Sequence, residues 1–250
     1  MTPEQAIEYL PAIAGATPDR LVQPGAVADT WLLARGDERI VLRIDRAIAA
    51  RMGLNRRAEL KVLDLAARAC IGPAVLAADP VRGLLATRFL KGRQWSGEDL
   101  HDPAQLTRLG GLLRKVHELP VTEPALDLAG AAHRYANVAA SREAQQIARQ
   151  LCALLPPAPE RLRLCHADPT APNILDDGRL ILLDWEYAGS GDPLFDLAVA
   201  IEHHSLSRVC ADALLSGYGR RLDRDAEIRL RCWREVYGLL KTLWIQAVMD

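Results

Sequence analysis

The spacing of apolar residues divides the chain into a part rich in strands and a part rich in helices. Helical spacing, with apolar residues three and four positions apart, predicts helices over 54–70, 106–119 and 131–155. Short apolar runs bounded by Gly, Pro or Asp are typical of strands, and they occur at 20–23, 30–34, 39–44, 74–77, 84–90 and 162–165. Apart from the last, all of these runs lie in the first ninety-one residues.

Helices are also expected at the start of the chain and after residue 198. Thr2 and Gln5 fit a capping box and Pro3 suits the first helical position, so a helix should begin here. It should end near Leu10-Pro11. After residue 198 the pattern stays helical to the end of the chain, with breaks near 205 and 216–217.

The stretch from Leu164 to Ala198 contains a strong hairpin signal. A turn at 176–179, which reads Asp-Asp-Gly-Arg, separates two short apolar runs at 174–175 and 180–183. Asp168 and Asn173 lie on the loop that enters this hairpin, and Asp184 lies where it ends. One tight element therefore brings three oxygen-bearing side chains to one place.

These three residue types suit phosphoryl transfer. A carboxylate can orient an attacking hydroxyl and accept its proton, while an amide oxygen and a second carboxylate are hard ligands for Mg²⁺. Kinases have His-x-Asp, an Asn five residues after that Asp, and a metal-binding Asp beyond a hairpin, and His166, Asp168, Asn173 and Asp184 follow that order. A polar loop that only serves turns is the alternative, but turn chemistry does not require this set.

The stretch resembles the aminoglycoside phosphotransferase and choline kinase superfamily. His166-Ala167-Asp168 stands where that family usually has His-Gly-Asp, 183–187 reads Leu-Asp-Trp-Glu-Tyr as in its metal-binding strand, and 191–198 keeps Gly-Asp-Pro-x-x-Asp-Leu-Ala. The resemblance implies an α+β, bilobal protein-kinase-like fold, with a small antiparallel-sheet N-terminal lobe and a mainly helical C-terminal lobe. It also implies Asp168, Asn173 and Asp184 as catalytic residues, and Asp196 as a structural carboxylate that braces the catalytic loop.

The resemblance further implies ATP and Mg²⁺ as cofactors, with Asn173 and Asp184 as the metal ligands. Residues 1–91 are expected to form a nucleotide-binding lobe and 92–250 a catalytic and acceptor-binding lobe. Val-Leu-Arg-Ile at 41–44 is similar to choline kinases and their bacterial relatives. The residues expected to bind the nucleotide are the turn glycine, the strand cation, its helix glutamate and the segment that would meet adenine: Gly25, Arg43, Glu59, Arg88, Phe89 and Leu90. From pattern alone, Glu59 is equally typical of a solvated helix face, and the alternative for Arg43 is an outward-facing side chain in an alternating strand.

Two features favour a small-molecule acceptor over a protein. Ala167 stands where protein kinases commonly have an Arg, and the short segment between Asp184 and Pro193 leaves little room for an activation loop. Aromatic residues are scarce, yet three share one stripe of the last helix and two follow Asp184. Such rings attract cations, so they are the expected acceptor-binding residues: Trp185, Tyr187, Trp233, Tyr237 and Trp244. The alternative is that the aromatic side chains of the last helix only pack in the hydrophobic core.

The function predicted from the sequence is therefore an ATP-dependent kinase that phosphorylates a hydroxyl of a cationic amino-alcohol, such as choline or ethanolamine. Thiamine kinase is the near alternative, because thiamine is also a cationic alcohol. An aminoglycoside phosphotransferase is less favoured, because 206–250 is not strongly acidic. The alternative from another class is a pseudokinase that binds nucleotide without catalysis, which the single glycine of the first turn and Arg43 leave open.

Composition and cysteine usage indicate which partners and which location to expect. A net charge of −1 argues against a nucleic-acid partner, and no apolar run approaches the roughly 20 residues of a membrane span. Five scattered cysteines without a Cys-x-x-Cys, and no signal-peptide pattern at the start, favour reduced core thiols in a cytoplasmic protein. The adjacent His203 and His204 do not share a helix face, so zinc is not expected. The expected partners are ATP, the acceptor and, as a candidate, a second copy of the chain.

Overall fold

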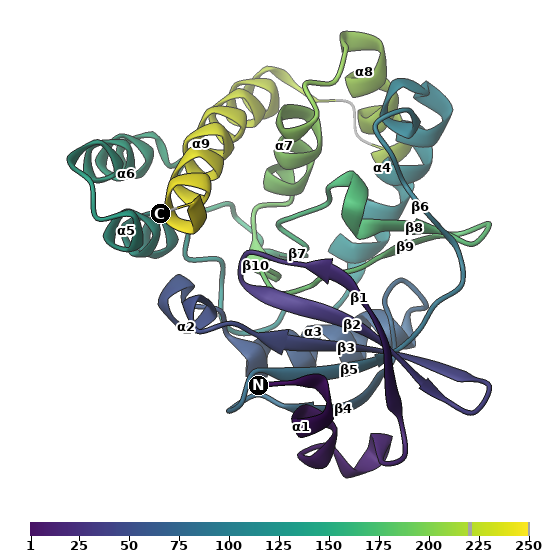
Figure 1. Ribbon diagram of the computed structural model, residues 1–250. Coiled ribbons are helices and arrows are strands. Elements are labelled where there is room, and N and C mark those ends of the chain that lie inside the picture. The colour runs from purple at the N-terminus through teal and green to yellow at the C-terminus, as the bar shows by residue number, and fades with distance from the viewer. Residues whose placement is uncertain (220–221, 250) are drawn as a thin grey trace. The chain divides into compact units, whose positions relative to one another are not determined.

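The computed structural model describes residues 1–219 and 222–249 and divides into two compact units, Met1–Lys91 and Gly92–Asp250 (Figure 1). We call these the N-terminal unit and the C-terminal unit. The prediction that helix continues to the end of the chain includes Arg220, Arg221 and Asp250, which lie outside the described residues.

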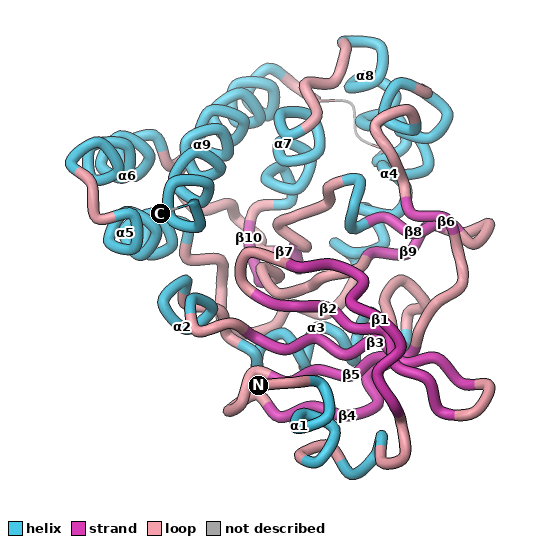
Figure 2. Tube along the Cα trace, in the orientation of Figure 1, coloured by secondary structure: helices cyan, strands magenta, loops and turns pink. Residues whose placement is uncertain are grey.

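The N-terminal unit contains a five-stranded sheet in the order β1-β2-β3-β5-β4, and every neighbouring pair is antiparallel (Figure 2). The sheet confirms the predicted antiparallel N-terminal lobe, with each strand extending or trimming its predicted range by a few residues. The strands are β1 (Thr17–Pro24), β2 (Ala28–Arg35), β3 (Glu38–Asp45), β4 (Val75–Asp79) and β5 (Leu84–Arg88).

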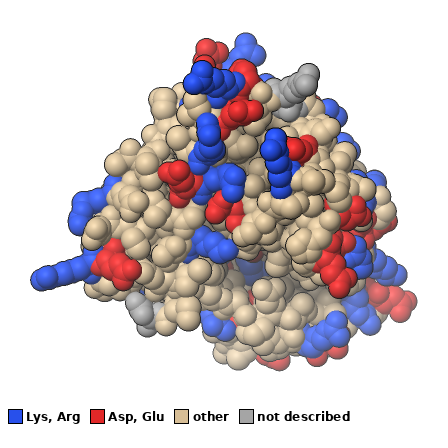
Figure 3. All heavy atoms as spheres, turned by 90° about the horizontal axis from the view of Figure 1, so that it is seen from above, with Lys and Arg blue, Asp and Glu red and all other residues tan. Residues whose placement is uncertain are grey.

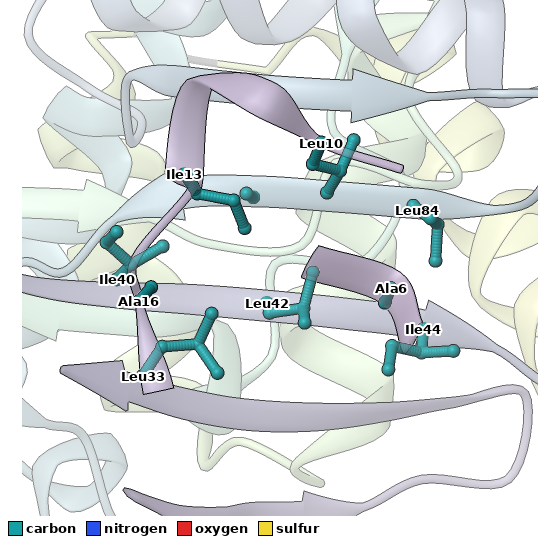
Figure 4. Packing of buried hydrophobic residues seen from close by; sticks show 10 residues of the cluster. Ala6, Leu10, Ile13, Ala16, Leu33, Ile40, Leu42, Ile44 and Leu84 are labelled. Carbon is teal, nitrogen blue, oxygen red and sulfur yellow. The ribbon is translucent and has the colours of Figure 1, made fainter. Parts of the chain in front are cut away.

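One face of this sheet packs on the start of the chain. Helix α1 (Pro3–Glu8) begins with the expected capping box, and the 3₁₀ turn η1 (Pro11–Ile13) follows it. Their apolar side chains contact Ile40, Leu42 and Ile44, which alternate along β3 and are buried (Figure 4). Because neighbouring residues of a strand point to opposite faces, Arg43 and Asp45 lie on the other face.

That other face carries helix α3 (Arg56–Arg68), which Asn55 caps by accepting a hydrogen bond from Ala58 N–H. A short helix that the sequence pattern did not predict, α2 (Ile48–Met52), links β3 to α3 and ends at Gly53. The apolar side of α3 is buried through Val62, Leu63 and Ala66. Its first turn also contains two buried charged side chains, Arg56 and Glu59.

The C-terminal unit holds two small sheets around the predicted hairpin. Strands β8 (Ile174–Asp176) and β9 (Leu180–Leu182) form that hairpin, and β6 (Arg93–Gln94) pairs with β8. Strand β7 (Arg163–Cys165) pairs with β10 (Gly189–Gly191), a strand that the sequence pattern did not indicate. Two 3₁₀ turns, η2 (Asp99–His101) and η3 (Ala171–Asn173), complete the loops.

Six helices of the described residues make up the rest of the C-terminal unit: α4 (Pro103–Glu118), α5 (Leu128–Ala139), α6 (Arg142–Leu154), α7 (Pro193–His203), α8 (Arg208–Tyr218) and α9 (Arg224–Met249). Helix α7 is central, since every residue from Leu194 to Ile201 is buried. The break near 205 is confirmed, whereas the second break lies after Tyr218, a little later than predicted.

The single helix expected over 131–155 is wrong, because two helices occupy this range. Ala140 adopts a left-handed conformation with φ 51°, which ends α5. Ser141 then caps α6 by accepting a hydrogen bond from Ala144 N–H at 3.0 Å. Apolar spacing continues through the break, so periodicity alone does not reveal it.

Surface and cysteine distribution fit an ordinary globular chain. On the face shown in Figure 3, acidic and basic side chains are interspersed rather than gathered by sign. None of the helices within 1–219 and 222–249 combines the length and the apolarity that crossing a bilayer requires. All five cysteines are free, but only Cys165 and Cys210 are buried, so the expectation of core thiols is wrong for the exposed Cys70.

Candidate active site

The loop between β7 and β8 holds Asp168 and Asn173 in direct contact. The 3₁₀ turn η3 brings Asn173 back onto the loop, and its Nδ2 donates to Asp168 Oδ2 at 2.8 Å and to the Asp168 carbonyl at 3.0 Å. The Asn173 carbonyl in turn accepts from Leu183 N–H at 2.8 Å, which joins the loop to the end of the hairpin. Asp184 is the next residue along the chain.

His166 sets the distance between the loop and Asp184. Its Nδ1 accepts a hydrogen bond from Asp168 N–H at 3.2 Å, so the ring proton lies on Nε2, which donates to the Leu183 carbonyl at 2.9 Å. Burial lowers the pKa of His166 to about 4, so the ring is neutral at pH 7. His166 therefore positions Asp168 and Asp184 and does not act as a base.

Asp196 of α7 holds the start of the same loop. Its Oδ1 accepts from Ala167 N–H at 2.7 Å, and its Oδ2 accepts from His166 N–H at 2.8 Å and lies 3.0 Å from His117 Nε2. Burial alone would raise the pKa of Asp196, but the hydrogen bond and charge of His117, with smaller contributions from His166, hold it below its ordinary value. A fully buried carboxylate thus stays ionised because donors surround it.

Two side chains of the site, Asn173 and Asp184, fit Mg²⁺. Asn173 directs its amide nitrogen at Asp168, which leaves Oδ1 as the atom that can face a cation, and Asp184 is exposed. Both offer the hard oxygen ligands that Mg²⁺ prefers. His117, Cys165 and Asp196 also bring ligand atoms within 4.8 Å of one another. We assign no metal to that group, because hydrogen bonds occupy Asp196 and burial raises the pKa of the Cys165 thiol well above its usual range.

A second carboxylate lies near Asp168. Burial and, next, the negative charge of Glu186 raise the pKa of Asp168 to about 7, although the hydrogen bond from Asn173 opposes this. The same two causes raise the pKa of the Tyr135 and Tyr187 hydroxyls. Glu186 is itself buried, and its charge acts on Asp168 and on both tyrosine hydroxyls. Glu186, although inside the Asp-Trp-Glu-Tyr motif, and Tyr135, which comes from α5, are not among the site residues predicted from the sequence.

The five predicted acceptor-binding residues divide into core and site. Trp185 has no exposed surface; its indole Nε1 donates to the Leu182 carbonyl at 3.0 Å and its ring packs edge-on against His166. Trp233 is 7% exposed and donates from Nε1 to Asp192 Oδ2 at 2.6 Å. Neither ring offers a face to a ligand in this structure, because each packs in the core.

The other three lie closer to the site. Trp244 Nε1 donates to the Tyr187 hydroxyl at 2.9 Å, and both side chains are half-buried. The Tyr237 hydroxyl hydrogen-bonds His203 Nδ1, and the charge of Asp168 contributes to its raised pKa, after burial. His204 Nε2 accepts from Ala171 N–H at 3.2 Å, so the histidine pair supports the catalytic loop rather than a metal.

In the N-terminal unit, Arg43 and Glu59 form a bidentate ion pair. Their guanidinium and carboxylate atoms lie 2.7 and 2.6 Å apart, and Arg56 binds Glu59 at 3.0 Å and Asp45 at 2.7 and 2.8 Å. Burial would raise the pKa of Glu59, but the charges and hydrogen bonds of both arginines hold it below its ordinary value. The helix glutamate therefore contacts the strand cation, as the resemblance implies.

The remaining nucleotide candidates lie at strand ends. A Cβ on Gly25 would lie 2.2 Å from the Ala28 carbonyl, so closure of the β1–β2 turn itself requires glycine. The backbone N–H groups of Arg88 and Phe89 already donate to carbonyls of the sheet, at 2.9 and 3.2 Å. A backbone donor for adenine would therefore come from beyond Phe89, nearer Leu90, whose side chain is half-buried.

Comparison with known proteins gives a consistent picture. A model of the phosphotransferase enzyme family, APH, matches residues 20–233. The solved structure of a choline/ethanolamine kinase family protein from Mesorhizobium loti is 28% identical, with a TM-score of 0.69 over 98% of this chain and 85% of that one.

Two curated relatives match over a shorter stretch. Protein LicA of Haemophilus influenzae is 39% identical over 94 residues, which is 34% of this chain and 35% of that protein. A thiamine kinase of Salmonella heidelberg is 38% identical over 95 residues, which is 36% of this chain and 33% of that protein. The matched stretch thus spans about a third of these relatives.

Ala167 has φ 66°, a left-handed conformation that costs a residue with a Cβ roughly 1–2 kcal/mol. We expect Ala167→Gly to raise the melting temperature by about 2 °C, since relief of this strain exceeds the extra entropy of the unfolded chain. Ala171→Gly, in the same loop without a positive φ, should lower it. If both variants lower the melting temperature equally in calorimetry, the loop is not strained at Ala167.

Proposed function

The chain belongs to the phosphotransferase enzyme family, and we propose that it transfers the γ-phosphoryl group of ATP to the hydroxyl of a small cationic alcohol such as choline or ethanolamine. The observation that carries the proposal is the catalytic loop, in which Asn173 Nδ2 donates to Asp168 Oδ2 at 2.8 Å and His166 links Asp168 to Leu183, the residue before Asp184. The negative charge of Glu186 that acts on Asp168, and the hydrogen-bonded rings of Trp244 and Tyr187, favour a cationic acceptor.

Asp168 is the group that acts on the acceptor. Its carboxylate orients the attacking hydroxyl and accepts its proton as the bond to the γ-phosphorus forms, while the bond from that phosphorus to the β,γ-bridging oxygen breaks and ADP leaves. Asn173 Oδ1 and Asp184 would hold Mg²⁺, which neutralises phosphate charge when it is bound. His166 keeps Asp168 and Asp184 at a fixed spacing, through hydrogen bonds to Asp168 N–H and the Leu183 carbonyl.

The N-terminal unit is proposed to bind the nucleotide. Arg43 carries a fixed positive charge, and its ion pair with Glu59 restricts the guanidinium to one position. The unit as a whole has 13 Lys and Arg against 10 Asp and Glu, which suits an anionic ligand. Gly25 keeps the first turn tight enough for its backbone to approach phosphate, and Leu90 is the proposed neighbour of adenine.

The acceptor is proposed to lie on the C-terminal unit, which has 18 Lys and Arg against 22 Asp and Glu. Glu186 supplies the charge, and Tyr135, Tyr187 and Trp244 supply rings for the cationic head. Each cation–π contact is worth ~0.5–2 kcal/mol, so two of them shift affinity by roughly tenfold. Trp185, Trp233 and Tyr237 are left out of this set because their rings are buried in the core.

Thiamine is the second candidate acceptor, favoured by the local match to a thiamine kinase. It is also a cationic alcohol, but its charge sits on a larger ring farther from the hydroxyl. Aminoglycosides are polycations and would need a more strongly acidic surface than this unit has. A pseudokinase is disfavoured, since Asp168 and Asn173 are in contact and His166 links Asp168 to the residue before Asp184.

The experiment that tests the proposal is ³¹P NMR of the protein with MgATP and a panel of choline, ethanolamine, thiamine, kanamycin and glucose. A phosphomonoester signal with choline or ethanolamine, and none with glucose, is the expected result. A phosphomonoester with glucose alone would reject the cationic acceptor. Hydrolysis of ATP to phosphate without any ester, across the panel, would reject this acceptor class altogether.

Two alanine variants separate the roles of the carboxylates. Asp168→Ala should abolish transfer and largely spare MgATP binding, because Asp168 acts on the acceptor. Asp184→Ala should weaken MgATP binding, because it removes a charged ligand of the metal. Isothermal titration with MgATP measures both, and equal losses of affinity in the two variants would contradict this division.

The rate should depend on the ionisation of Asp168. A protonated carboxyl cannot accept the proton of the acceptor, so kcat/KM should fall about tenfold per pH unit below the pKa of about 7. Glu186→Gln removes the nearby negative charge and should move this acid limb to lower pH. A pH–rate profile with the same midpoint in both proteins would show that Glu186 does not control Asp168.

Trp244 and Trp233 form a matched pair for the acceptor. Trp244→Ala should raise KM for the acceptor by roughly tenfold and leave KM for ATP nearly unchanged, because one ring face is lost. Trp233→Ala should instead cost about 3–5 kcal/mol of stability, as for a core tryptophan. Steady-state kinetics beside melting curves decide; loss of stability in Trp244→Ala with an unchanged acceptor KM would place Trp244 in the core.

A further inference from the structure

Helices α4 and α8 approach each other at their backbones. A Cβ on Gly110 of α4 would lie 2.1 Å from the Leu214 carbonyl oxygen, and one on Gly217 of α8 would lie 2.0 Å from the Thr107 carbonyl oxygen. Glycine is therefore needed on both sides of this crossing, and Figure 1 shows the two helices side by side. The close approach fixes the last turn of α8, which ends at Tyr218, against α4.

Tyr218 reaches from that turn into a buried chain of hydrogen bonds. Its hydroxyl lies 2.8 Å from His117 Nδ1, and the two rings meet edge to face with centroids 5.4 Å apart. His117 is 3% exposed, and its Nε2 lies 3.0 Å from Asp196 Oδ2. These hydrogen bonds thus link Tyr218 of α8, through His117 of α4, to the carboxylate that holds the catalytic loop.

The charge of Asp196 sets the direction of its bond to His117. An ionised carboxylate only accepts, so a proton of His117 must lie on Nε2, toward Asp196. The other ring nitrogen, Nδ1, is paired with the Tyr218 hydroxyl, a group that can donate as well as accept. Tyr218 therefore holds the ring orientation that directs Nε2–H at Asp196.

We propose that Tyr218 is a positioning residue for the catalytic loop, acting through His117 and Asp196 on the backbone that carries Asp168. Asp196 Oδ1 restrains Ala167 N–H at a strained φ of 66°, one residue before Asp168. A carboxylate that loses its alignment releases this restraint, and the loop relaxes toward ordinary backbone angles. Only the kinetic part of this proposal rests on the proposed function.

Tyr218→Phe removes one hydroxyl and keeps the ring, so packing against His117 is retained. Hydrogen exchange at the His166 and Ala167 amides, followed by mass spectrometry of peptides over 164–170, should speed up by about tenfold because their acceptor is less fixed. Cys210→Ala is the matched control: it truncates a buried side chain of the same helix without touching Tyr218 or His117. It should leave exchange in 164–170 unchanged.

The kinetic readout separates positioning from general damage. With the best acceptor of the panel, Tyr218→Phe should lower kcat by about three- to tenfold and leave KM for ATP nearly unchanged, since Asp184, the proposed charged metal ligand, lies outside the loosened segment. Cys210→Ala, although less stable, should keep kcat. Equal exchange and equal kcat in Tyr218→Phe and the wild-type protein would overturn the proposal.

A double-mutant cycle tests the route. His117→Gln can still donate to Asp196 but has no ring nitrogen for Tyr218, so adding Tyr218→Phe to it should change neither exchange nor kcat further. Additive effects would show that Tyr218 acts by another path and would overturn the proposal. The exchange arm needs no acceptor: if no compound of the panel is phosphorylated, the proposed function fails while the effect of Tyr218 is still decided.

Discussion

The buried carboxylate of Asp196 is the interaction on which the C-terminal unit depends. Three N–H groups, from His117, His166 and Ala167, point at its two oxygens. An isolated buried carboxylate would cost far more than folding supplies, but donors on both oxygens offset that cost. Because α7 is buried along almost its whole length, Asp196 cannot move without disturbing the packing of the unit. Asp196 therefore anchors the catalytic loop to a buried helix.

Buried charges are also paired in the N-terminal unit, where arginines are the partners of the acids. There Arg43, Arg56, Glu59 and Asp45 form a network in which each acid contacts an arginine at 3.0 Å or less. Removal of one member leaves a buried charge without its partner, which makes such networks specific in geometry rather than strong in net energy. One unit thus presents a fixed cation suited to phosphate, and the other presents carboxylates suited to a metal and a cationic alcohol.

The sequence reveals those parts of the fold and site that are local. The hairpin and the oxygen-bearing residues around it follow from one turn signal and short spacings, and the antiparallel N-terminal sheet follows from alternating runs. The break at Ala140 is invisible because apolar spacing continues across it. An aromatic stripe does not tell a core ring from a ligand-facing one, so spacing alone does not separate Trp233 from Trp244. Tyr135 joins Glu186 only through tertiary packing, which no spacing encodes.

The role of Asp196 can be tested most directly by Asp196→Asn. The variant keeps the shape of the side chain but replaces one accepting oxygen with an amide that faces N–H donors. We expect a folded protein whose kcat falls by roughly a hundredfold or more while its affinity for MgATP changes by less than about threefold. A folded Asp196→Asn protein with kcat within about threefold of the wild-type value would contradict this role of Asp196.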